Sequence, residues 1–301
     1  MVYDVVIVGG GPAGLSAALA LGRSRRSVLL CDAGPRRNAA AERIQNFVTR
    51  DGTPPEEFRR IGHEELSAYP SVEIRPERVG SIEGSRGAFV VQLEAGRVEA
   101  RRILLCTGMV DEMLPLEGFR ELWGRSIFQC PYCHGWEARD QRWAFLPVGA
   151  AAAHLLPFAL QAKTWSPEVT VFTNGAFEVA KEVRDGLERA GLRLVTEPLK
   201  RLVMGGHRLE AIELVGGERV PCEVLFTQPP QRQVELIEAL DLPLDEDGYV
   251  RIDPMRRETL LPGIYAAGDS TPKMQAAVLG AAAGLQAAAM INVDLAMDLI
   301  S

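Results

Sequence analysis

The N-terminal residues carry the pattern that most constrains the fold. Val2 to Val8 is an apolar run with the length of a buried strand, and it leads directly into the glycine-rich run 9–14. A helical pattern begins by Leu15, and the next apolar run, 27–32, ends on an acid. Strand, glycine turn, helix and strand in this order predict a βαβ unit and therefore an α/β fold.

The glycine-rich run fits G-x-G-x-x-G, the pattern of a turn that binds a dinucleotide. Its glycines permit a tight turn, a close approach of backbone N–H groups to a pyrophosphate, and packing of the helix on the strand. Asp32 is placed to accept hydrogen bonds from an adenosine ribose. The alternative is a glycine turn that only packs. The predicted cofactor residues here are Gly9, Gly11, Pro12, Ala13, Gly14 and Asp32.

A second strand, helix and strand pattern lies in the middle of the chain, at 143–148, 150–162 and 169–173. Turn-forming residues bracket it, Thr107-Gly108 before it and the proline-rich run 228–231 after it. Near the C-terminus a short buried strand closes on Gly268-Asp269, and an Ala/Leu-rich helix follows from about Lys273. The middle pattern thus interrupts a domain that the C-terminal segment completes.

These patterns predict two doubly wound, Rossmann-like domains, the second inserted into the first. Residues 1–112 and 233–301 form the first domain, and residues 113–232 form the central one. A chain of 301 residues with 47% hydrophobic content is long enough for two ordinary cores.

Composition excludes several classes of partner. A net charge of -7 without a lysine-rich stripe argues against nucleic acid, and the pairs Arg36-Arg37 and Arg59-Arg60 are interpreted as solvated surface. No basic segment precedes the first apolar run, and the stretch 276–291 is interpreted as too short and too weakly hydrophobic for a membrane span. We therefore expect a cytoplasmic protein without a membrane partner.

The central domain carries the run Cys130-Pro131-Tyr132-Cys133-His134. Two cysteines three residues apart can close a small disulfide ring, and a thiol near a helix N-terminus beside a histidine can have a lowered pKa. Histidine titrates near neutrality, so His134 could accept a thiol proton. A structural disulfide is the alternative.

The other cysteines and histidines indicate no metal site. A zinc site needs further ligands at regular spacing, and His154, His207 and Cys222 do not supply them. Cys31, Cys106 and Cys222 lie in apolar runs and are interpreted as small buried thiols.

Taken together, the motifs resemble those of the low-molecular-weight thioredoxin reductases. The shared order is GGGPAG, an acid after the second strand, CTG at 106–108, CxxC, and AAGD at 266–269. The string CPYCHGWE, at 130–137, is most similar to the branch with the FAD-dependent dithiol oxidases of gliotoxin and holomycin biosynthesis.

The resemblance implies FAD as the cofactor and a homodimer. It implies that Cys133 exchanges electrons with the flavin and Cys130 with the substrate. It also places His134 where the parent family has an acid/base aspartate. The further flavin contacts that it implies are Asn46, Thr107, Gly108, Gly268, Asp269 and Gln275.

The central domain departs from an NADPH-dependent reductase in its own turn. Of the glycines expected in the run 147–154 only Gly149 is present, and methyl groups would crowd a pyrophosphate. The run 173–175 after the next strand has no arginine pair to bind a 2'-phosphate. We therefore expect a degenerate nucleotide-binding fold that does not use NADPH.

The predicted function is oxidation of dithiols through the Cys130-Cys133 disulfide and FAD, with oxygen as acceptor. The substrate would be a small molecule or a thioredoxin-like protein. One alternative is a disulfide reductase that receives electrons from ferredoxin or another flavin, and a further one is a non-enzymatic flavin redox sensor. Tyr132, Trp136 and Trp165 could stack on a second flavin or an aromatic substrate, but aromatic residues are more often core.

Overall fold

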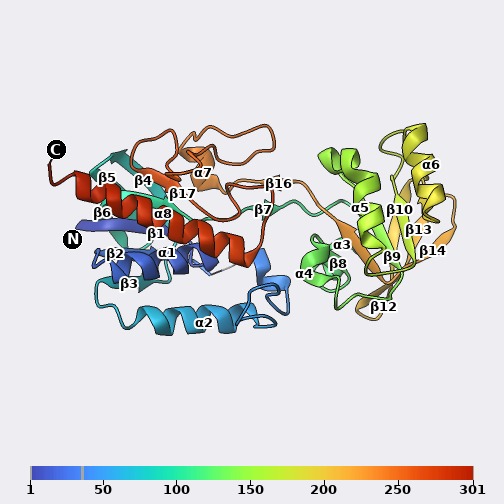
Figure 1. Ribbon diagram of the computed structural model, residues 1–301, viewed down its shortest axis with the longest axis horizontal. Helices are drawn as coiled ribbons and strands as arrows, with labels where there is room; N and C mark the ends of the chain where they lie inside the picture. Colours follow the sequence, from blue (N-terminus) through green and yellow to red (C-terminus); the bar gives the residue numbers. More distant parts are fainter. Residues whose placement is uncertain (1, 35–36, 301) are drawn as a thin grey trace. The chain divides into compact units, whose positions relative to one another are not determined.

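The computed structural model describes residues 2–34 and 37–300. The chain forms two compact units (Figure 1). Unit 1 comprises residues 1–39, 47–110 and 231–301, and unit 2 comprises residues 40–46 and 111–230. The division expected from the sequence has its crossings at 112 and 233, two residues away in each case, and it assigned 40–46 to the first domain. At the crossings, β7 (Val110–Asp111) pairs with β16 (Gln231–Arg232).

Unit 1 is built on a seven-stranded mixed sheet in the order β3-β2-β1-β6-β5-β4, with β17 also paired to β6. The strands β2, β1, β6 and β17 run parallel, so their carboxyl ends meet at one edge of the sheet. The strands are β1 (Val2–Val8), β2 (Val28–Cys31), β3 (Val72–Arg75), β4 (Val79–Ser85), β5 (Ala88–Leu93), β6 (Gly96–Leu105) and β17 (Ile264–Ala266).

Both faces of this sheet are buried, which explains why residues 5–8 of β1 form a continuous apolar run. Val6 and Val8 belong to one core cluster, and Val5 and Ile7 to the other. The helices of unit 1 are α1 (Pro12–Arg23), α2 (Pro55–Leu66), α7 (Glu235–Ala239) and α8 (Ala277–Met297), with the 3-10 helix η1 at Arg37–Ala40. In Figure 1, α1 and α8 lie side by side, and a methyl group at Gly284 of α8 would come within 2.0 Å of the Ala13 carbonyl oxygen.

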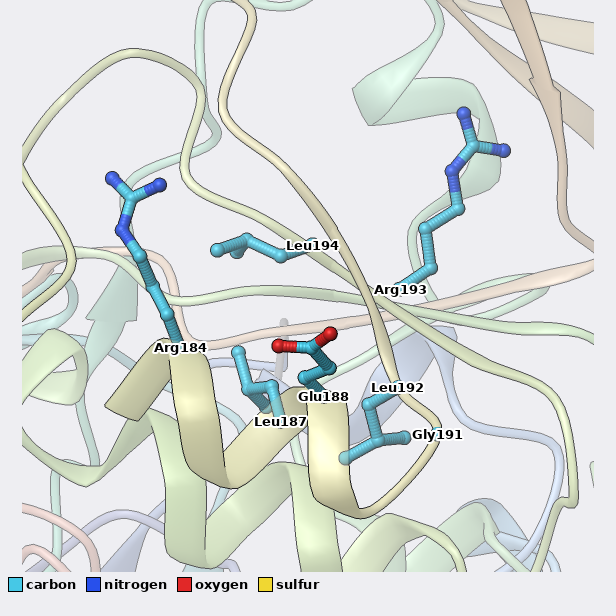
Figure 2. Close-up of a pocket in the computed structure, with 7 residues that line it drawn as sticks. All are labelled: Arg184, Leu187, Glu188, Gly191, Leu192, Arg193 and Leu194. Atoms are coloured by element: carbon cyan, nitrogen blue, oxygen red, sulfur yellow. The ribbon is translucent and has the colours of Figure 1, made fainter. Parts of the chain in front are cut away.

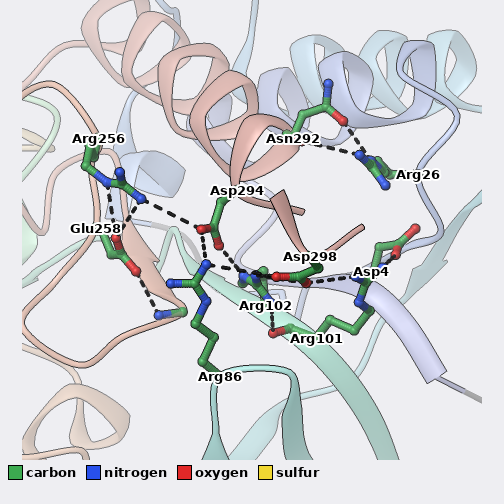
Figure 3. A network of polar contacts seen from close by, with 11 residues as sticks. Asp4, Arg26, Arg86, Arg101, Arg102, Arg256, Glu258, Asn292, Asp294 and Asp298 are labelled. Atoms are coloured by element: carbon green, nitrogen blue, oxygen red, sulfur yellow. Dashed lines mark hydrogen bonds and ion pairs between the residues drawn. The ribbon is translucent and has the colours of Figure 1, made fainter. Parts of the chain in front are cut away.

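A network of ion pairs fastens α8 to β6 (Figure 3). The fully buried Arg102 pairs with Asp294, and its second nitrogen donates to Asp298 at 2.8 Å. Arg101 joins Asp298 to Asp4 of β1 at 2.8 Å each. The interaction of α8 with the sheet therefore depends on buried charge as well as on close packing.

By length and composition alone α8 could cross a membrane, since it has 21 residues and only 33% of its most apolar window is buried. The expectation that this stretch is too short was wrong, because the helix continues six residues past Ile291. This is weak evidence for a span, since the core helix of a soluble protein passes the same test. Its close contact with α1 and its buried Asp294 are features of a core helix.

Unit 2 has a five-stranded parallel sheet in the order β11-β10-β9-β15-β8 and a three-stranded antiparallel sheet in the order β12-β13-β14. The first sheet comprises β8 (Ile127–Phe128), β9 (Trp143–Leu146), β10 (Val169–Phe172), β11 (Arg193–Val195) and β15 (Val224–Thr227). The second comprises β12 (Leu199–Gly205), β13 (Arg208–Leu214) and β14 (Arg219–Pro221). The helices are α3 (Phe119–Leu122), α4 (Pro131–His134), α5 (Leu155–Ala162) and α6 (Lys181–Arg189).

The helix expected at 150–162 is only half α-helical. Its first part is the 3-10 helix η2 (Gly149–His154), and α5 begins at Leu155. Pro157 explains the change, because it has no N–H to donate to the carbonyl of Ala153 and is tolerated only in the first turn of a helix. The α/β class and the Rossmann-type fold predicted from the sequence are confirmed.

Candidate functional site

The two cysteines of the CxxC motif lie at the start of α4 in unit 2. Cys130 is the N-cap residue, Pro131 occupies the first helical position, and the N–H groups of Cys133 and His134 donate to the Cys130 carbonyl at 3.2 and 3.3 Å. The two cysteines are not joined by a disulfide, both are half-buried, and the Cys133 thiol donates to the Cys130 sulfur at 3.0 Å. Because a disulfide bond is about 2.05 Å long, a small movement brings the two sulfurs within bonding distance, and removal of two electrons and two protons by an oxidant would then close a disulfide.

The cysteines of this chain differ sharply in acidity. The hydrogen bond from the Cys133 thiol lowers the pKa of Cys130 to about 7, and the backbone N–H groups of Cys133 and Tyr132 act in the same direction against burial. Burial instead raises the pKa of Cys31, Cys106 and Cys222 to about 12. The lowered pKa favours the thiolate form of Cys130 near neutral pH, and the thiolate is the reactive form of a cysteine.

His134 closes α4 and lies in an apolar environment. Its ring stacks on Phe128 with the centroids 4.2 Å apart, and its Nδ1 atom is buried without a hydrogen-bond partner. Burial lowers the pKa of His134 below its usual value, against the effect of the nearby Glu137. The imidazole is therefore neutral at pH 7 and available to accept a proton.

In unit 1 the glycine turn has both packing and open positions. A methyl group at Gly9, whose φ is +110°, would lie 2.2 Å from the Cys106 carbonyl oxygen, and one at Gly14 would lie 1.9 Å from the Gly9 carbonyl oxygen. A methyl group at Gly11 would meet nothing within 4 Å. Gly9 and Gly14 thus let the turn form, and Gly11 keeps its outer face clear for a ligand. Pro12 and Ala13 begin α1 directly behind the turn.

Several predicted cofactor residues gather at the carboxyl ends of adjacent strands. Asp32 follows β2, is 4% exposed, and would collide with a side chain at Gly10. Thr107 follows β6, and its buried hydroxyl has no hydrogen-bond partner. Gly108 comes next with φ +69°, and Gly268 follows β17 close to the start of α1, since a methyl group there would lie 3.1 Å from the Ala13 side chain. The carboxylate of Asp32 and the hydroxyl of Thr107 lie where a dinucleotide bound at this edge of the sheet could form hydrogen bonds with them.

Asp269 and Gln275 share one polar cluster with Arg37. Arg37 pairs with Asp269 at 3.0 Å and also donates to the Gln275 side chain. The Gln275 amide donates to the Asp269 carbonyl at 3.1 Å and to Gln231 at 3.0 Å. The two predicted flavin contacts are therefore brought together. Asn46, the third of this kind, lies in unit 2, where its amide donates to the Tyr132 carbonyl at 2.7 Å.

Two arginines that were interpreted as solvated surface belong to the unit 1 site. Arg59 of α2 donates to the buried Asp32 at 2.7 Å, and Arg37 pairs with Asp269, with side-chain exposures of only 22% and 17%. Arg36 lies outside the described residues. The interpretation as solvated surface was wrong for these two residues, because the sequence does not show whether an arginine is hydrated or paired with an acid far away in the chain.

The comparison with known proteins decides the family. The model of the pyridine nucleotide-disulphide oxidoreductase family matches residues 3–284. The chain belongs to this family. It is 31% identical to a thioredoxin reductase, tcpT, of Claviceps purpurea, over 99% of this chain and 96% of the relative.

Solved structures give the same result. An oxidoreductase from Agrobacterium tumefaciens superposes with a TM-score of 0.91 at 34% identity, over 99% of both chains. The protein HlmI superposes with a TM-score of 0.89 at 33% identity, over 99% of this chain and 94% of that one. The predicted resemblance is confirmed, and the chain is a thioredoxin reductase-like oxidoreductase that acts on sulfur groups.

The turn of unit 2 departs from what the family's name implies. Between β9 and α5 the chain forms the 3-10 helix η2 rather than a glycine turn leading straight into an α-helix. After β10, the side chain of Asn174 accepts a hydrogen bond from the Leu199 N–H at 2.7 Å and so serves the backbone of unit 2. The printed sequence has no arginine or lysine at 173–176, where cations would meet a 2'-phosphate.

A surface hollow of unit 2 lies between the end of α6 and β11 (Figure 2). Three leucines, two arginines, a glutamate and a glycine line it. None of the predicted site residues is among its lining, so we assign it no role in the chemistry. The lining residues are Arg184, Leu187, Glu188, Gly191, Leu192, Arg193 and Leu194.

Proposed function

We propose that this protein is an FAD-dependent dithiol oxidase that works without NADPH and uses oxygen as the electron acceptor. The observation that carries the proposal is a contrast within one chain. Unit 2 keeps a CxxC pair with one acidic thiol, but its turn after β9 has lost the features that bind a nucleotide. A dithiol substrate is then the electron source that the site itself can recognise.

The net reaction balances with oxygen alone. A substrate dithiol loses two electrons and two protons and becomes a disulfide, while O2 gains them and becomes H2O2. Within the protein, the substrate exchanges with a Cys130-Cys133 disulfide, which leaves two cysteine thiols and a substrate disulfide. FAD, when bound, supplies the two-electron acceptor that reoxidises the thiol pair.

The chain's own residues have distinct roles in this proposal. The first substrate sulfur attacks Cys130 of the disulfide and displaces Cys133. The second substrate sulfur then displaces Cys130, and the lowered pKa of Cys130 makes it a good leaving group. Cys133 is the sulfur that exchanges electrons with the flavin, as the family resemblance implies. His134, neutral and with an unpartnered Nδ1, takes the proton of the incoming thiol.

The FAD site is proposed in unit 1 from the fit of its residues. Gly11 leaves open space beside the turn, Asp32 accepts from the ribose, and the Thr107 hydroxyl gains the partner that it lacks. Asp269 and Gln275 hold the flavin end of the cofactor.

A disulfide reductase is the second candidate, and the printed name of the tcpT relative favours it. The same thiols would then pass electrons from ferredoxin or another flavin to a disulfide substrate. A non-enzymatic sensor differs from both in having no steady-state turnover. The homodimer and the cytoplasmic location stay predictions.

Anaerobic reduction of the FAD-loaded protein tests the proposal. NADPH, NADH and dithiothreitol are added in separate cuvettes, the flavin absorbance is followed, and air is then admitted. We expect the dithiol alone to bleach the flavin, and air to restore it with formation of peroxide. Rapid bleaching by NADPH would refute NADPH independence, and failure of all three donors would favour the ferredoxin-type reductase.

Cysteine variants locate the reaction at CxxC. Cys130→Ser and Cys133→Ser should each abolish dithiol turnover with FAD still bound. Cys222→Ser is the matched control, because this buried thiol of unit 2 has a pKa of about 12 and should be inert. Full activity in both CxxC variants would refute the proposed mechanism.

A further inference from the structure

One peptide group links the two cysteines to a segment far away in the sequence. The carbonyl of Tyr132 and the N–H of Cys133 belong to the same planar peptide. The carbonyl accepts a hydrogen bond from the Asn46 amide at 2.7 Å. The N–H at the other end donates to the Cys130 carbonyl at 3.2 Å and also stabilises the charged form of the Cys130 sulfur.

The segment that carries Asn46 is held on unit 2 at other points as well. Gln45 donates to Glu137 at 3.0 Å, and a methyl group at Gly124 would come within 2.5 Å of the Ala40 carbonyl oxygen. Asn46 itself has φ +60°, a left-handed conformation that asparagine tolerates better than most residues. This backbone and its neighbours fix the direction of the Asn46 amide.

We propose that Asn46 is a positioning residue of the dithiol, which acts through the Tyr132–Cys133 peptide on the sulfur of Cys130. Its amide fixes the orientation of that peptide and polarises it, so that the Cys133 N–H becomes a stronger donor toward Cys130. This inference rests on the Cys130-Cys133 pair as the redox pair of the proposed function. It gives Asn46 a role different from the flavin contact expected from the sequence.

The polarity of the peptide predicts which way the thiolate of Cys130 should respond to loss of the Asn46 amide. A donor on the carbonyl oxygen increases the positive charge at the N–H of the same peptide. That N–H donates to the carbonyl of Cys130 and favours the charged form of the Cys130 sulfur, so loss of the amide should make the thiolate less favourable. Asn46→Gly keeps the left-handed backbone and removes only the donor, whereas Asn46→Ala also strains the backbone.

The pH dependence of Cys130 alkylation tests the proposal in the FAD-loaded, anaerobically reduced protein. Iodoacetamide labels the thiolate, and mass spectrometry of the peptide that contains Cys130 gives the rate for that residue alone. We expect Asn46→Gly and Asn46→Ala to slow labelling at pH 6 roughly threefold, the equivalent of a rise of half a pKa unit. The rate at high pH should match the wild type.

Gln45→Ala is the control, because it removes a neighbouring contact of the same segment and leaves the Tyr132–Cys133 peptide intact. Its alkylation profile should be that of the wild type. An unchanged profile in both Asn46 variants would overturn the proposal, and weaker FAD binding with an unchanged profile would return Asn46 to the flavin. Alkylation needs neither oxygen nor turnover, so this test remains informative if the oxidase function fails, and the oxidase assay remains informative if Asn46 has no such role.

Discussion

Units 1 and 2 both contain a pattern of strand, turn and helix, but the two turns differ in the structure that follows the strand. In unit 1 the turn after β1 leads into α1 at once, through Gly11 and Pro12. In unit 2 the turn after β9 becomes the 3-10 helix η2, and α5 begins six residues later than Gly149. The mixed sheet of unit 1 and the parallel sheet of unit 2 are nevertheless alike in having largely buried central strands, β1 and β9.

The difference shows that the fold and the binding site depend on different residues. Apolar strands such as β1 and β9 pack both faces of a parallel sheet whatever follows them. Binding depends on a few backbone positions in the turn, and those can be lost without loss of the sheet. Substitutions in the two turns test whether these backbone positions decide which unit binds a nucleotide.

The largest effect is expected from Gly14→Ala in unit 1. The added methyl group would lie 1.9 Å from the Gly9 carbonyl oxygen, so the turn and α1 cannot both keep their places. We expect the purified variant to contain no FAD. Gly149→Ala, at the first position of the corresponding turn in unit 2, meets nothing within 4 Å and carries only the strain of φ +55°, so it should keep its FAD and lose about 1 kcal/mol of stability.

The chain offers separate probes for these two outcomes. All four tryptophans, at 123, 136, 143 and 165, lie in unit 2, whereas the predicted flavin site lies in unit 1. Flavin absorbance therefore reports on unit 1, and tryptophan fluorescence during urea unfolding reports on unit 2. A Gly14→Ala protein with a full complement of FAD would contradict our reading of the turn.

The second largest effect is expected from the ion network of unit 1. Asp294→Ala leaves the fully buried Arg102 with only Asp298 as an acidic partner (Figure 3). Breaking a buried pair in this way should lower the free energy of unfolding of unit 1 by about 3 kcal/mol. The tryptophan signal of unit 2 serves as the internal control. An unchanged flavin transition in urea would show that α8 does not depend on this network.

Glu213 is the centre of an ion network in unit 2, as Asp294 is in unit 1. The stability that Glu213 gives to unit 2 should depend on pH. Glu213 pairs with Lys200, Arg201 and Arg219, and hydrogen bonds from Lys200 and Arg201 lower its pKa to about 2. Because the pKa is lower in the folded state, the stabilisation is complete above pH 4.5 and is lost as the pH falls toward 2. Glu213→Gln should flatten this part of the tryptophan-monitored stability profile, and a profile as steep as the wild type's would contradict the assignment.

The sequence predicted those parts of the molecule that follow from local patterns. The bounds of β1 coincide with the apolar run 2–8, and β9 and β10 lie within the runs expected for them. Parallel strands then bring their carboxyl ends together, so Asp32, Thr107 and Gly268 could be expected at one edge.

Other features depend on contacts between distant residues and carry no periodic signal. Nothing in the order of residues indicates that 40–46 joins unit 2, because its contacts with Tyr132 and Glu137 are polar and non-local. Likewise, the residue order alone does not show that the Cys133 thiol donates to the Cys130 sulfur, and this hydrogen bond, followed by the backbone N–H groups at the start of α4, lowers the pKa of Cys130.

The smallest effect is expected from restoring the glycine pattern of unit 2. Ala151→Gly with His154→Gly recreates G-x-G-x-x-G from Gly149 onward, but it supplies no cation near Asn174 for a 2'-phosphate. We expect no bleaching of the flavin by NADPH and a loss of about 1 kcal/mol from the tryptophan-monitored unfolding, since glycine weakens a helical segment. Addition of Asn174→Arg sharpens the test by supplying the missing charge. Rapid bleaching by NADPH in the double variant would mean that the missing glycines alone prevent NADPH binding in unit 2. The region after β10 would then contribute nothing to this difference between the units.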